Sequence, residues 1–149
     1  MKDVKAVFRN VETMLRQTTW FEHGWEIFNR GAYMQLYKSN WYNASQGGVH
    51  FETFIEDAQL RQKAFPIALH AEADCPSQQR FIEALVESER GRIQGWKGYR
   101  LVGRGYTVCE RILPLNFKAL EQRLLQEFNQ LRELEAAVDQ TLTRLEGKT

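Results

Sequence analysis

Two short segments decide the fold: VHFETFI at residues 49–55 and FPIALHA at residues 65–71. In each segment the side chains alternate at the two-residue period of a β-strand. One alternate set is mainly apolar, while the other contains histidine and glutamate. The two segments therefore predict an antiparallel hairpin that turns one face to a hydrophobic core.

The polar face of this hairpin carries the strongest candidate for chemistry. If the register pairs Ile55 with Phe65, the two histidines lie directly opposite each other, with the two glutamates as diagonal neighbours. Imidazole nitrogens and carboxylate oxygens are donors that zinc, manganese or iron accepts. The pattern therefore predicts a site for a divalent transition metal, formed by His50, Glu52, His70 and Glu72. The alternative is that these side chains are the solvated face of an antiparallel sheet, with no cofactor.

Patterns elsewhere in the chain predict three helices and two further strands. Apolar residues recur at spacings of three and four from Val4 to Leu15, which indicates an amphipathic helix. Residues 20–28 continue the apolar content, either within this helix or as a second short helix after a break near Gly24. The remaining expected elements are a strand over residues 32–42, a helix beginning at residues 74–77, a strand over residues 106–113 and a helix over residues 116–145.

This order of elements predicts a single α+β domain over residues 1–149. Its 149 residues, 43% of them hydrophobic, are enough for one full core. Helices and strands do not alternate regularly, so a doubly wound parallel sheet is not expected. We expect an antiparallel sheet of three to five strands packed against helices, with a long C-terminal helix.

An apolar repeat of seven residues runs through the C-terminal segment 116–145, which no proline or glycine interrupts. A helix of this length extends roughly 45 Å, longer than a compact domain of this size, so its apolar seam needs a cover. A second copy of the chain would supply one, which predicts a homodimer. The alternative is packing on the N-terminal helix of the same chain. The predicted interface residues are Phe117, Leu124, Leu131, Val138 and Leu145.

The glycine-rich segment 90–111 is strongly basic and contains interleaved aromatic residues. Arginine pairs with phosphate, and aromatic rings stack on unpaired bases, so RNA or single-stranded DNA is a reasonable ligand. The alternatives are a solvated loop and a surface for an acidic protein partner. The candidate nucleic-acid-binding residues are Arg90, Arg92, Trp96, Lys97, Arg100 and Arg104.

Composition narrows the class of protein without naming a function. Twenty basic and nineteen acidic side chains give a formal net charge of +1, so no global field attracts nucleic acid or an anionic membrane. The N-terminal MKDVKAVFRN lacks the apolar stretch of a secretory signal, and no apolar run is long enough to span a membrane. Cys75 and Cys109 form no CxxC pair. We therefore expect a soluble, cytoplasmic protein without membrane association or disulfides.

Three functions follow from these patterns. The leading prediction is a small non-enzymatic interaction module that self-associates through its C-terminal helix and binds a macromolecular partner, either protein or nucleic acid. The first alternative is a metal-dependent enzyme that uses the His/Glu cluster on the sheet. The second is RNA or single-stranded DNA binding through segment 90–111.

Overall fold

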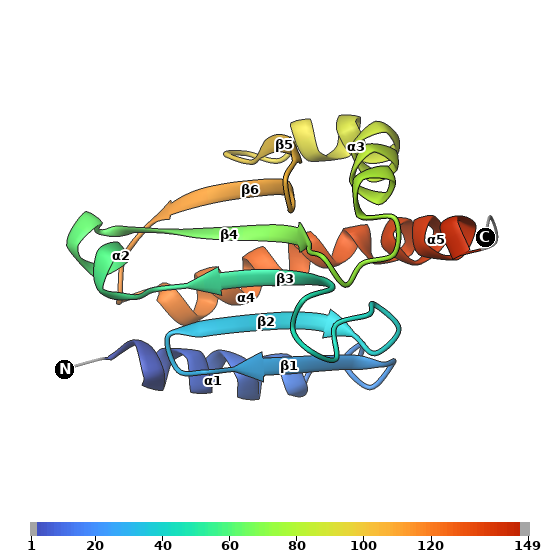
Figure 1. Cartoon of the computed structure of the whole chain (residues 1–149). Helices are drawn as coiled ribbons and strands as arrows, with labels where there is room; N and C mark the ends of the chain where they lie inside the picture. The colour runs from blue at the N-terminus through green and yellow to red at the C-terminus, as the bar shows by residue number, and fades with distance from the viewer. Residues whose placement is uncertain (1–2, 147–149) are drawn as a thin grey trace.

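Figure 1 shows the computed structural model, which describes residues 3–146 as one antiparallel sheet with helices. The sheet has six strands in the order β1-β2-β3-β4-β6-β5, and all neighbouring pairs are antiparallel. The α+β prediction is confirmed, with more strands than the three to five expected. The strands are β1 (Trp25–Asn29), β2 (Tyr33–Lys38), β3 (Val49–Phe54), β4 (Ala64–Ala71), β5 (Arg100–Arg104) and β6 (Thr107–Pro114).

Helices cover one face of this sheet. In Figure 1 the N-terminal and C-terminal helices lie behind the strands, and the face turned to the viewer is largely open. The covered face holds the core, where Phe8, Phe51 and Phe128 are fully buried. The helices are α1 (Val4–Arg16), α2 (Asp57–Gln62), α3 (Gln78–Gln94), α4 (Leu120–Leu131) and α5 (Glu135–Glu146).

The predicted hairpin is strands β3 and β4, and its predicted register is confirmed. Thr53 pairs with Ile67, and His50 lies opposite His70. The apolar set of each strand packs toward the helices, while the histidines rise from the open face. The connection between the strands contains the short helix α2, which the sequence pattern did not indicate.

Two strands at opposite edges of the sheet were not expected. Residues 25–29 form β1, where we expected helix, because this segment pairs with β2 across a turn in which Gly31 adopts a φ of +96°. Trp25 and Ile27 then alternate toward the core at the period of a strand. At the other edge β5 pairs irregularly with β6, and the positive φ of Gly103 interrupts its pattern. Pairing with a neighbouring strand decided the conformation of both segments. Local periodicity carries little information about such pairing.

The predicted long C-terminal helix is confirmed over residues 120–146. One 3₁₀ turn at Arg132–Leu134 lies within it, between α4 and α5. Residues Leu124, Leu131 and Val138 are fully buried within the chain, where α4 packs against α1 and α5 packs against α3. The apolar seam is therefore already covered at these positions. The homodimer stays a prediction, although the uncovered apolar seam that motivated it is not present at these positions. Its predicted interface residues are Phe117, Leu124, Leu131, Val138 and Leu145.

Across residues 3–146, no helix combines the length and the apolar character needed to cross a membrane.

Candidate metal centre

The four predicted ligands come together on the open face of the sheet. His50 and Glu52 lie on β3, His70 lies near the end of β4, and Glu72 follows that strand. Although this face has no helical cover in Figure 1, His50 is 0% exposed, Glu52 is 7% exposed and His70 is 8% exposed. The solvated-face interpretation expected exposed side chains here, so their burial needs a different physical explanation.

The donor atoms of the four side chains lie within 4.8 Å of one another. The His50 Nε2 atom is 3.0 Å from Glu52 Oε1 and 2.9 Å from Glu72 Oε2. The His70 Nδ1 atom is 3.2 Å from Glu52 Oε1. Two imidazole nitrogens and two carboxylates therefore converge on one small volume.

Asn43, in the loop between β2 and β3, fixes the orientation of the His50 ring. The backbone N–H of Gly48 donates to Asn43 Oδ1 at 2.8 Å, and the Asn43 Nδ2 group donates to Gln35 Oε1 at 2.7 Å. The Asn43 oxygen also lies 2.9 Å from His50 Nδ1. Because an amide oxygen can only accept, the Nδ1 atom of His50 must carry a hydrogen. The Nε2 atom is then left to face the two carboxylates.

Tyr33, on β2, holds the Glu52 carboxylate from the other side. Its hydroxyl donates to Glu52 Oε1 at 2.5 Å and accepts from Gln35 Nε2 at 2.7 Å. The Gln35 side chain thus links Tyr33 to Asn43. Two of the candidate ligands, His50 and Glu52, are therefore backed by hydrogen bonds from outside the cluster that set where their donor atoms point.

Burial and the hydrogen bonds around the cluster shift the pKa values of His50, Glu52 and Tyr33. Burial lowers the pKa of His50, but hydrogen bonds and charge from Glu52 and Glu72 outweigh it, so the pKa lies above its ordinary value. Burial raises the pKa of Glu52, but hydrogen bonds from His50, His70 and Tyr33 hold that pKa well below its usual range. Burial and the hydrogen bond to Glu52 raise the pKa of Tyr33, so its hydroxyl remains a neutral donor.

These distances can be compared with those of a metal site. For donors about 2.0–2.1 Å from a tetrahedral ion, neighbouring donor atoms are separated by about 3.3 Å. Three nitrogen–oxygen pairs here are 2.9, 3.0 and 3.2 Å apart, and all four donor atoms lie within 4.8 Å of one another. Side-chain movements on the order of 1 Å would place these donors around one ion. A set of two imidazoles and two carboxylates suits zinc, manganese or iron.

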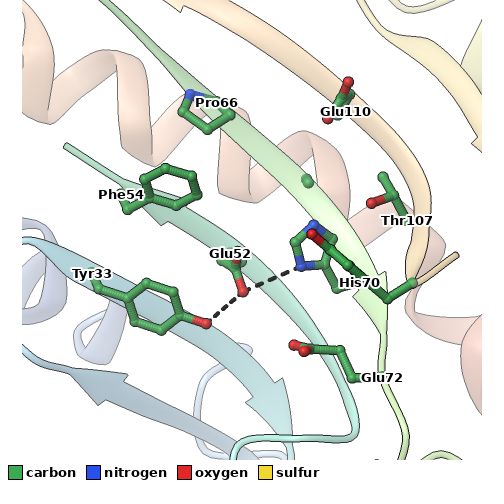
Figure 2. A pocket seen from close by; sticks show the side chains of 10 residues that line it. Tyr33, Glu52, Phe54, Pro66, His70, Glu72, Thr107 and Glu110 are labelled. Carbon is green, nitrogen blue, oxygen red and sulfur yellow. Dashed lines mark hydrogen bonds and ion pairs between the residues drawn. The ribbon is translucent and has the colours of Figure 1, made fainter. Parts of the chain in front are cut away.

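A pocket of about 390 Å³ opens beside the cluster, lined partly by Glu52, His70 and Glu72. Figure 2 shows these side chains and Tyr33 pointing toward one another at one end, with Phe54 and Pro66 further along the strands. The volume falls in the range of small-molecule pockets. The cluster is therefore buried from below by the sheet and accessible from above through the pocket.

The cationic residues predicted to bind nucleic acid are partly engaged elsewhere. The Arg92 guanidinium pairs with Glu89 at 2.9 Å and with Glu133 at 3.4 Å. The Arg100 Nε atom donates to Glu110 at 2.9 Å, across the β5-β6 pair. Nearby acids therefore reduce the positive charge that these two residues offer to a phosphate.

The aromatic part of that prediction fits the structure less well. Trp96 is buried in the core, where its ring packs edge-on against Tyr99 at a centroid distance of 5.3 Å. A buried indole offers no free face on which a base can stack. Nucleic-acid binding by segment 90–111 stays a prediction that depends on its exposed cations, Arg90, Lys97 and Arg104.

Sequence reasoning missed the residues that position the cluster: Tyr33, Gln35 and Asn43. A signal was present, because Tyr33 and Gln35 alternate on one face of a predicted strand and Asn43 begins a predicted turn. Their role depends on β2 pairing next to β3, with Gln35 opposite Glu52. That pairing could not be read from either segment alone.

Comparisons of the chain with protein-family models, with curated proteins and with solved structures found no match. The functional argument therefore depends on the chemistry of this site.

Proposed function

We propose that this protein binds one divalent transition-metal ion on the open face of its sheet, through His50, Glu52, His70 and Glu72. The observation that carries the proposal is the orientation of His50. Its Nδ1–H is committed to Asn43, so its Nε2 atom is directed at two carboxylate oxygens, 2.9 and 3.0 Å away. With no ion bound, the Nε2–H group donates to the carboxylates, and on losing its proton the nitrogen is already aimed at the position an ion would take. A histidine held by a carbonyl oxygen through its other nitrogen is the usual arrangement at a metal.

Burial supports the proposal over a purely structural role. Ionised groups away from water are costly unless they are paired or bound to a cation. Glu52 and Glu72 together bring two negative charges to the cluster, and balancing them without a cation would require both His50 and His70 to be protonated, with the His50 ring fully buried. A divalent ion between neutral histidines and two carboxylates would balance the charge fully.

Access from the pocket supports a functional ion over a sealed structural one. Four protein ligands fill a tetrahedral zinc ion, but zinc can expand to five-coordinate, and manganese or iron accepts more than four donors. Here the pocket borders three of the four candidate ligands. The same arrangement supports the metal-dependent enzyme as a narrower form of the proposal, with the reaction taking place in the pocket.

The direct test is metal uptake by untagged protein. Protein stripped with a chelator would be titrated with Zn²⁺ in a calorimeter, and its zinc content measured after removal of free metal. We expect one Zn²⁺ per chain. The variants His70→Ala and Glu72→Gln should lose this binding, and the Glu72 side chain, 33% exposed, is the one whose change least threatens the fold.

His23→Ala is the matched control, because His23 is the third histidine of the chain and lies exposed away from the cluster. This variant should retain full uptake. Circular dichroism would establish that each variant is folded. Absence of zinc uptake by the folded wild type would refute the proposal, as would equal uptake by folded wild type and both ligand variants.

A further inference from the structure

The pocket continues past the metal cluster along strands β3 and β4, and its chemistry changes on the way. Near the cluster its walls are the candidate ligands. Phe54 lies two residues beyond Glu52 on β3, and on β4 Ala68 and Pro66 lie two and four residues from His70. The side chains of Phe54, Ala68 and Pro66 form the other end of the wall. The pocket therefore has a polar end and an apolar end.

Ala68 is the reason that the sheet face is hollow at this point. It lies between Glu52 on β3 and Glu110 on β6, its direct partners on the two neighbouring strands. A single methyl group between two long side chains leaves space above the sheet. The Ala68 methyl group is the apolar part of its floor.

The apolar end has a rigid aromatic wall. The rings of Tyr33 and Phe54 lie with their planes 17° apart and their centroids 6.4 Å apart. The Tyr33 ring is further held by its hydroxyl bond to Glu52. A flat ring placed above Ala68 would lie beside Phe54 and Pro66, which line the same pocket.

Charge restricts what the pocket can accept. Its lining, within residues 3–146, includes three carboxylates and neither lysine nor arginine. Glu110 is neutralised by Arg100, and an ion at the cluster would neutralise Glu52 and Glu72. A multiply charged anion such as a phosphate ester would find no free cation on these walls, so an uncharged ligand fits best.

We propose that the pocket binds a small, uncharged aromatic molecule whose single nitrogen or oxygen donor coordinates the metal while its ring lies on Ala68, Phe54 and Pro66. This inference rests on the proposed metal binding. It adds the ligand class, a planar apolar body attached to one coordinating head. The polar and apolar ends of the pocket each recognise one part of such a molecule.

Two probes with the same head test this inference. Imidazole and 4-phenylimidazole both offer one neutral ring nitrogen to a metal, but only the second carries an aromatic body. Each would be titrated into Co²⁺-loaded protein, with the visible absorption of the ion as the readout. We expect 4-phenylimidazole to bind at least about tenfold more tightly, from burial of its phenyl ring.

The variant Phe54→Ala should reduce this preference severalfold while leaving the affinity for imidazole unchanged. Leu60→Ala, at an exposed apolar residue of α2, is the matched control and should keep the full preference. Equal affinities for the two probes in loaded wild type would overturn the inference alone, as would a preference that survives Phe54→Ala. Failure to take up Co²⁺ or Zn²⁺ would overturn the metal proposal and this inference with it.

Discussion

The two faces of strand β3 are both buried, but by different means. Phe51 points to the helices and is enclosed by apolar side chains, whereas its neighbours His50 and Glu52 point the other way and are enclosed by polar ones. On the core face, close packing excludes water. On the open face, a network from Asn43 through Gln35 to Tyr33 satisfies each buried polar group. Burial is therefore not evidence of a hydrophobic environment in this sheet.

The two kinds of burial respond differently to mutation. A core side chain that is shortened leaves a cavity, whose cost depends on how far its neighbours relax. A polar side chain that is removed leaves its partners charged and unpaired. Three substitutions along adjacent strands separate these costs.

The largest effect is expected on the core face. Phe51→Ala should lower the free energy of unfolding by about 4 kcal/mol, because it empties a fully buried aromatic site between sheet and helices. Urea denaturation followed by circular dichroism would measure the loss. A loss below about 1 kcal/mol would mean that this face is not closely packed.

A smaller but still large effect is expected one residue earlier, on the open face. His50→Leu should lower the free energy of unfolding by about 3 kcal/mol in metal-free protein, because it leaves Glu52 beside Glu72 without their shared cationic partner. The same urea titration would measure it. The double variant His50→Leu/Glu52→Leu should recover part of the loss, since the buried carboxylate that has lost its His50 partner is then absent.

If His50→Leu alone were as stable as the wild type, the polar network would not be a cooperative unit. The two faces of β3 would then differ only in how closely their side chains are packed.

The smallest effect on folding, with a clear effect on function, is expected at Tyr33. Tyr33→Phe removes the hydroxyl that donates to Glu52 and should cost about 1 kcal/mol of stability. If the proposed metal binds, its affinity should fall at least about tenfold, because the orientation of one ligand is lost. Calorimetry with Zn²⁺ would measure the affinity.

Tyr37→Phe is the control for this variant, since Tyr37 lies on the same strand but outside the pocket lining. Equal affinities in the two variants would show that the hydroxyl of Tyr33 does not position Glu52.

Sequence patterns predicted the α+β fold, with fewer strands than the sheet has, and the register of its central hairpin. The period of two in β3 and β4 separated the histidines from the core residues, and the hairpin register then placed His50 opposite His70. Both steps use contacts close along the chain. Burial of the cluster could not be predicted, because Asn43 and Gln35 act through the pairing of β2 with β3.

The edges of the sheet show the same limit. Residues 25–29 have the aromatic content of a core helix as much as of a strand, and pairing with β2 alone decides between them. The heptad pattern in segment 116–145 correctly indicated a long helix. It could not specify whether α1, α3 or a second copy of the chain covers the seam.

The placement of α4 and α5 has a consequence for synthesis of the protein on the ribosome. These helices form much of the layer over the apolar sheet face, yet they are translated after all six strands. Until residues 120–146 emerge, side chains such as Phe51 and Leu69 lack this cover, although their strands are already complete. We expect the nascent chain to be most prone to aggregation at this stage, and the sheet face to close only when α4 and α5 dock.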